Sequence, residues 1–169
     1  LEFRRVLFRS VGVYLNPRHK GFQRNLNSAI YVDKTGLLEQ TNCVLETQQK
    51  FLCVSRPRRF GKSMAADMLA AYYSCGEDSS ELFDRLQISR SASYRKNLNR
   101  YDVIKVNMQD FLSMTHSMDD MLAMLQRYLI RDLTRSFKDV DFFDRTNLIQ
   151  MLKDIYAETD RAFVILIDE

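Results

Sequence analysis

The sequence predicts an α/β fold in which helices flank a parallel sheet. Two continuous apolar runs, residues 51–54 and 163–167, are typical of strands buried on both faces. Residues 101–108 alternate apolar and polar side chains, which indicates a further strand, nearer the sheet edge than 163–167. Because strands that alternate with helices form parallel sheets with right-handed crossovers, we expect a ligand at the carboxyl ends of the strands.

The first apolar run leads into a basic loop. Residues 51–63 read FLCVSRPRRFGKS, and a helical pattern follows at once over 62–73. This is the strand–loop–helix context of a phosphate-binding P-loop. Backbone N–H groups and the helix dipole would attract phosphate, Lys62 would reach the β- and γ-phosphates, and Ser63 Oγ would ligate Mg²⁺. The full motif has a further glycine five residues before Gly61, where this chain has Arg56.

The second apolar run ends in two carboxylates, Asp168 and Glu169. At the end of a parallel strand, Asp168 would hold the Mg²⁺, usually through water, and Glu169 would polarise the attacking water. The two half-motifs together predict a P-loop NTPase-type sheet that binds a nucleotide. The alternative is two ordinary buried strands of an α/β domain, one of them followed by a basic turn.

Helical spacing and start signals predict the remaining elements. We expect a short helix over 36–40 with Thr35 as its N-cap, and a loop over 18–24. The other expected segments are a helix up to residue 86, a solvated connection over 89–99, a long helix from about 118 to 137 and a helix over about 147–158.

Composition limits the class of protein. The chain has 169 residues, 46% of them hydrophobic and 28% charged, which leaves room for one domain. Its net charge is +3, and the first ten residues contribute +2 of this, so direct nucleic-acid binding is not expected. No apolar run approaches the length of about 20 that spans a bilayer. The three cysteines are scattered and lack metal-site spacing, and the absence of a disulfide framework favours a reducing cytoplasm.

Residues 1–10, LEFRRVLFRS, differ sharply in character from the residues after them. We interpret them as a non-native leader and leave them out of the fold. The alternative is a basic amphipathic arm for a membrane or nucleic acid.

Five segments together resemble one family: YVDKT (31–35), SRPRRFGKS (55–63), AAYYS (70–74), ELF (81–83) and ILIDE (165–169). It is a bacterial AAA-ATPase-like family of predicted AAA-type ATPases, and the resemblance covers residues 11–169. Arginine in place of the first motif glycine is usual in this family. The resemblance implies that Lys62 and Ser63 are the Walker A lysine and hydroxyl, and that Asp168 and Glu169 are the Walker B pair.

The resemblance also implies a wider nucleotide site. Its expected members are Arg56, Arg58, Arg59, Phe60, Gly61, Lys62, Ser63 and Met64. Arg56 or Arg58 would contact phosphate directly, or these arginines are solvated loop charges. Tyr31, Asp33 and Lys34 belong to a family signature that lies near the base or ribose, or forms a structural turn.

Members of the family commonly carry a C-terminal PD-(D/E)XK nuclease-like domain, and AAA-like ATPases often form rings, so a nuclease-like partner domain and a homo-oligomer are expectations. In this fold group another strand follows Walker B and inserts between the two motif strands. We therefore expect 11–169 to be the N-terminal part of the domain, truncated after the Walker B strand.

The resemblance implies Mg²⁺-dependent ATP hydrolysis, with Lys62 and Glu169 as catalytic residues. A slow nucleotide-gated switch that regulates the nuclease-like domain is the alternative. The preference for ATP over GTP stays open.

Overall fold

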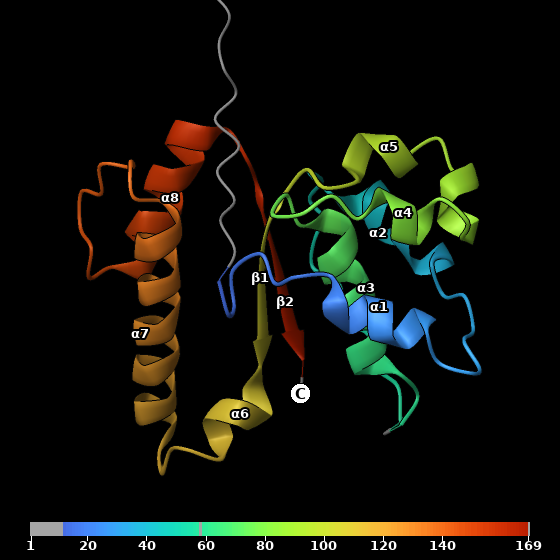
Figure 1. The fold of residues 1–169 in the computed structure, drawn as a ribbon. Helices are drawn as coiled ribbons and strands as arrows, with labels where there is room; N and C mark the ends of the chain where they lie inside the picture. The colour runs from blue at the N-terminus through green and yellow to red at the C-terminus, as the bar shows by residue number, and fades with distance from the viewer. Residues whose placement is uncertain (1–11, 58, 169) are drawn as a thin grey trace, which may run out of the picture.

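The computed structural model describes residues 12–57 and 59–168, and there helices lie on both sides of a pair of parallel strands (Figure 1). The predicted α/β class is confirmed. The elements are α1 (Lys20–Leu26), α2 (Gly36–Val44), α3 (Lys62–Tyr73), α4 (Ser80–Phe83), the 3₁₀ helix η1 (Gln87–Arg90), α5 (Tyr94–Asn97), β1 (Asp102–Asn107), α6 (Met108–Leu112), α7 (Met118–Ser136), α8 (Leu148–Thr159) and β2 (Phe163–Asp168).

The two strands pair in register from Asp102 opposite Phe163 to Asn107 opposite Asp168. β1 has a neighbour on its other edge as well, because Leu15 forms an antiparallel bridge with Ile104. β1 is therefore the more buried strand, whereas side chains of β2 reach the surface. The prediction that 101–108 lies nearer the edge than 163–167 is wrong.

The predicted strand over residues 51–54 does not form. This segment pairs with no strand of the described chain, and the side chains of Leu52 and Val54 are 55% and 50% exposed. Leu52 and Val54 instead line a cavity of about 250 Å³ together with residues 164–168 of β2. In the described chain the segment adds no strand to the pair formed by β1 and β2.

The sheet separates two apolar cores. Val103 and Leu166 pack with the core formed by α1 to α5, and Ile104 and Val106 pack with the core of α6, α7 and α8. Alternation of side chains along β1 explains this division, since neighbouring residues face opposite sides of a sheet. Figure 1 shows the same arrangement, with α7 and α8 on one side of the strands and α1 to α5 on the other.

Several helix predictions are confirmed. α3 spans the predicted residues 62–73, and α7 begins after Ser117, whose Oγ accepts a hydrogen bond from the backbone N–H of Asp120 (3.1 Å). The predicted loop over 18–24 is wrong, because α1 forms there and buries Phe22. The segment 89–99 contains α5 and buries Tyr94, so it is less solvated than predicted.

An ion pair joins α3 to the sheet. Lys105 of β1 pairs with Asp67 of α3, which fixes the helix on the sheet.

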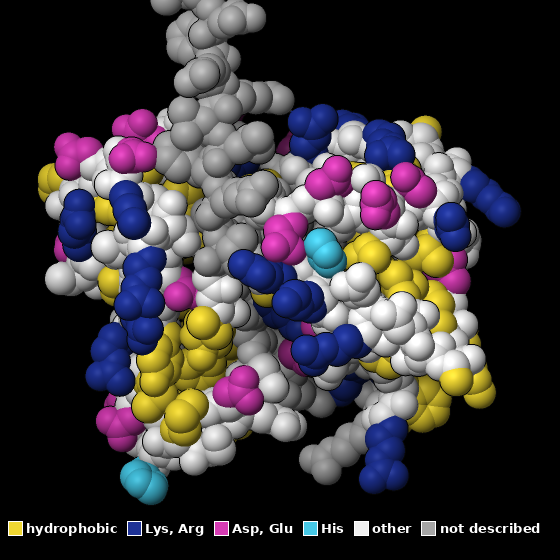
Figure 2. Space-filling view, viewed as in Figure 1, with side chains coloured by type: hydrophobic (Ala, Val, Ile, Leu, Met, Phe, Trp, Pro, Cys, Tyr) yellow, Lys and Arg dark blue, Asp and Glu magenta, His cyan; other side chains and the backbone are white. Residues whose placement is uncertain are grey.

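The surface carries an exposed apolar patch. Figure 2 shows this patch over the lower part of α7, where Met118 and Leu122 are exposed. Within the described residues, no helix is long and apolar enough to cross a membrane.

Candidate phosphate-binding site

α3 begins with a left-handed turn at Gly61, which has φ 79° and ψ 31°. Glycine adopts this conformation without strain, whereas a side chain would also approach within 3.0 Å of Lys34 Nζ. The helical hydrogen bonds begin with the N–H of Ala65, which donates to the carbonyl oxygen of Gly61 (3.0 Å). The N–H groups before Ala65 therefore have no acceptor inside the helix, and the start of α3 is suited to an anion.

The carboxyl ends of both strands lie at the same edge of the sheet, where Asn107 is opposite Asp168. Lys62, Ser63 and Asp168 line one cavity of about 510 Å³ at this edge. The loop and the second apolar run thus meet, although they are far apart in the sequence. A cation, a hydroxyl and a carboxylate around one hollow suit a phosphate group and a hard divalent cation.

The other loop residues differ in position. Arg59 lines the cavity of Lys62 and Ser63, and its backbone is also left-handed, with φ 67°. Arg56 is exposed and borders an adjoining hollow that also includes Lys62 and Asp168. Phe60 lies on the other side of Gly61, in a second cavity. Arg58 and Glu169 lie outside the described residues.

Comparison with models of protein families shows to which family this chain belongs. The family model of AAA-ATPase-like proteins, described as predicted AAA-ATPase, matches residues 22–169. The chain belongs to this family. Comparison with curated proteins and with solved structures gave no match.

In this AAA-ATPase-like chain, the signature segment 31–35 is tied to η1. Asp33 accepts hydrogen bonds from the N–H of Thr35 (2.8 Å), the hydroxyl of Thr35 (2.7 Å) and the N–H of Gln87 (2.7 Å). Burial alone would raise the pKa of Asp33, but these hydrogen bonds outweigh it and lower the pKa below its ordinary value. Thr35 occupies the predicted N-cap position of α2, but its buried hydroxyl accepts from the N–H of Ile88 (3.1 Å) instead of capping the helix.

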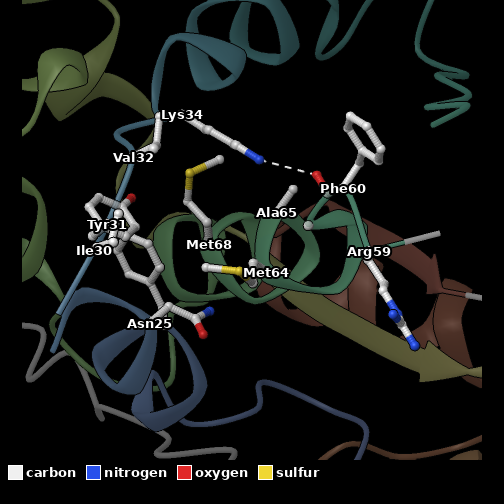
Figure 3. Close-up of a pocket in the computed structure, with 12 residues that line it drawn as sticks. Asn25, Ile30, Tyr31, Val32, Lys34, Arg59, Phe60, Met64, Ala65 and Met68 are labelled. Atoms are coloured by element: carbon white, nitrogen blue, oxygen red, sulfur yellow. Dashed lines mark hydrogen bonds between the residues drawn. The ribbon is translucent and has the colours of Figure 1, made fainter. Parts of the chain in front are cut away.

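Of the other two signature residues, Lys34 contacts the basic loop and Tyr31 packs against α1. Lys34 Nζ donates a hydrogen bond to the carbonyl oxygen of Phe60 (3.1 Å). Tyr31 packs edge-on against Phe22, with ring centroids 6.3 Å apart. Burial, followed by the charge of Asp33, raises the pKa of Tyr31 to about 12, so its phenol is neutral at physiological pH. Asp33 and Thr35 thus fix the segment, and Tyr31 and Lys34 line a separate cavity on the other side of Gly61 (Figure 3).

Sequence reasoning missed two residues of the cavity, Asn107 and Gln109. Asn107 ends β1 and caps α6, where its Oδ1 accepts from the N–H of Gln109 (3.0 Å). Neither residue belongs to a recognised motif. The sequence offered one signal for them, their position at the end of a predicted strand or just after it. Residues at the ends of neighbouring parallel strands lie side by side, so those at the end of residues 101–108 lie near Asp168.

The donor set also limits how a metal could bind. The described part of the chain contains no group of three or more His, Cys, Asp or Glu side chains that could hold a metal ion. Mg²⁺ does not require such a group, since it keeps several waters and binds through one or two carboxylates and the substrate phosphates. Ser63 and Asp168 fit that pattern.

Proposed function

We propose that this protein binds ATP with Mg²⁺ and hydrolyses it. One observation carries the proposal: the start of α3, with Lys62 and Ser63, opens into the same cavity as Asp168 at the end of β2. Membership of the predicted AAA-ATPase family supports the nucleotide as the ligand. In this proposal the basic loop is a P-loop, Lys62 and Ser63 are its Walker A residues, and Asp168 belongs to Walker B and helps to bind Mg²⁺.

Each residue has a role that follows from its chemistry. The N–H groups at the start of α3 and the ammonium of Lys62 would stabilise the phosphate charges, and more strongly so as charge moves onto the leaving group. Ser63 Oγ and the carboxylate of Asp168, the latter through water, would hold Mg²⁺. The metal ion, when bound, would offset the charge of the β- and γ-phosphate oxygens.

Glu169 follows Asp168 directly in the sequence and is proposed to orient the attacking water. A carboxylate in this role would accept a proton from the water as it attacks the γ-phosphorus. The coupling of hydrolysis to a nuclease-like partner domain is also a proposal, supported by the family resemblance alone.

The test compares ATP binding and turnover in the wild type, Lys62→Ala and Glu169→Gln. We expect Lys62→Ala to lose binding and turnover, and Glu169→Gln to keep binding while turnover falls about 100-fold or more. Lys153→Ala is the matched control, because it makes the same change at an exposed position of α8. Tight binding by the wild type with negligible turnover would contradict hydrolysis and favour the nucleotide-gated switch. Normal turnover by Glu169→Gln would contradict the role of Glu169.

A further inference from the structure

A line of arginines runs along one exposed face of α7. Arg127, Arg131 and Arg135 are all exposed, and they recur every four residues. Residues four apart lie one above the other on a helix, about 6 Å apart along its axis, so the three guanidinium groups share one face. Figure 2 shows Lys and Arg side chains that follow α7 in this way, beside the apolar patch. We call these three arginines the basic stripe.

The charge of the basic stripe is not neutralised within the described part of the chain. None of its arginines forms an ion pair there. Asp132 of the same helix is buried, and its carboxylate accepts hydrogen bonds from the N–H groups of Tyr14 (2.8 Å) and Leu15 (3.4 Å). Asp120 accepts from the hydroxyl of Ser117 (2.7 Å) at the start of the helix. Because like charges without a carboxylate between them repel, the stripe favours an anionic partner.

One end of the basic stripe opens on a hollow. Arg127 lines a cavity of about 390 Å³, whose other lining residues are Met114, Thr115, His116, Asp120, Ala123 and Met124. Arg127 also lies over the ring of Tyr128, which is half-buried beside the stripe, 5.7 Å from the ring centroid. Nucleic-acid bases stack on tyrosine rings and on guanidinium planes, and thioethers pack well against flat rings. The hollow therefore combines a phosphate-binding cation with surfaces that suit a base.

We propose that the basic stripe binds the backbone of a single-stranded nucleic acid, with one base in the hollow beside Arg127. Guanidinium groups bind phosphate oxygens through paired N–H donors, and arginines on successive turns would contact phosphates of successive nucleotides. Composition does not predict this site, because the net charge of +3 is small and only the helix brings the three charges together. The inference is independent of the proposed ATPase function, since no residue of α7 lines the phosphate-binding cavity.

The positions of the apolar side chains favour a nucleic acid over an anionic membrane. A helix that lies on a bilayer buries an apolar face in the lipid, whereas Leu129 and Leu133 of α7 are buried in the protein core. Met118 and Leu122 are exposed, but each residue turns a helix by about 100°, so they point about 140–180° away from Arg127. A flat bilayer could not contact these two side chains and the basic stripe together.

The test is the fluorescence anisotropy of a labelled dT oligomer of about 12 nucleotides, titrated with the protein between about 50 and 200 mM salt. Each phosphate contact on a single strand adds about −0.7 to the slope of log affinity against log salt, so three contacts predict a slope of about −2. Replacing all three arginines of the stripe with Gln should abolish the slope and lower the affinity at least tenfold at low salt. Arg131→Gln alone should reduce the slope by about 0.7.

Two control variants separate the basic stripe from net charge and from the basic loop. Arg85→Gln, Arg90→Gln and Arg100→Gln together remove the same charge at exposed positions between α4 and β1, and should leave affinity and slope nearly unchanged. Arg56→Gln with Arg59→Gln should also leave them unchanged, because these residues belong to the basic loop. The stripe variant should melt at the wild-type temperature, since the substituted positions are exposed and glutamine is a good helix former.

Two further ligands test the kind of partner. Unlabelled dT oligomer should displace the labelled one at least fivefold better than inorganic polyphosphate of similar length, because only the oligomer brings a base to the hollow. Equal displacement by the two would overturn the nucleic acid in favour of a general polyanion site. Sedimentation with phosphatidylserine-containing vesicles that depends on the stripe, without oligomer binding, would replace the nucleic acid by a membrane. Equal losses in the stripe and control variants would overturn the site on α7.

Discussion

The ammonium group of Lys34 donates a hydrogen bond to the carbonyl oxygen of Phe60 (3.1 Å), and so connects the signature segment 31–35 to the basic loop. The same ammonium lies 3.0 Å from the position that a Cβ at Gly61 would occupy. Asp33 and Thr35 anchor the segment to η1, so the loop is held from a fixed point. The signature segment therefore contacts the loop through the backbone carbonyl of Phe60.

Lys34→Met should weaken ATP binding about three- to tenfold, because it removes the hydrogen bond that holds the loop at Phe60. The melting temperature should change little, since Lys34 is exposed. Calorimetric titration with ATP measures the effect, and Lys153→Met controls for the lost charge. Equal affinities in the two variants would show that the contact does not position the loop.

Gly61→Ala should lower both the melting temperature and ATP affinity. A non-glycine residue in the left-handed conformation costs about 1–2 kcal/mol, and the new methyl group would also displace Lys34 Nζ. Gly36→Ala is the matched control at the first residue of α2, where a Cβ would meet its nearest neighbour at 3.4 Å and helix propensity favours alanine. Thermal unfolding of both variants checks the prediction, which fails if the two substitutions have the same effect.

The hydrogen bonds of Asp33 should make its contribution to stability depend on pH. Its pKa is lower in the folded chain than in the unfolded one, so its stabilising effect is present above the unfolded value of about 4 and is lost as the pH falls through the folded value. Asp33→Asn should therefore destabilise the protein at neutral pH. The difference from wild type should shrink in acid. Urea unfolding at several pH values measures this, and a difference that stays constant with pH would contradict the assignment.

β2 should be a site of self-association. Ile165 and Ile167 are 56% and 71% exposed, and one edge of the strand has no strand partner among the described residues. Exposed apolar edges template pairing between chains, and a lysine there opposes it. Ile167→Lys should reduce the concentration-dependent increase in mass seen by light scattering, whereas Ile149→Lys on the exposed face of α8 should not. Unchanged association in Ile167→Lys would exclude this edge as the cause.

Local patterns predicted the helices better than the strands. The bounds of α3 followed from Gly61 and from the spacing of Met68 and Tyr72, which the structure buries. α1 was missed because a single buried residue, Phe22, gives no periodicity. Residues 51–54 have the composition of a buried strand, but pairing depends on a neighbouring backbone, which composition does not reveal.

In the candidate site, too, local motifs could be predicted and tertiary neighbours could not. Gly61, Lys62, Ser63 and Asp168 carry motif signals, and the structure places them around one cavity. Asn107 and Gln109 owe their position to the parallel register of β1 and β2, which is a tertiary property.

The most direct test of the central claim, that α3 and β2 form one Mg²⁺–ATP site, is an ATP titration of the wild type and Asp168→Asn, each with Mg²⁺ and with a chelator. The account predicts that the wild type binds ATP more tightly with Mg²⁺ than with the chelator, and that Asp168→Asn loses most of this difference. Absence of ATP binding by the wild type, or an unchanged response to Mg²⁺ in Asp168→Asn, would contradict it.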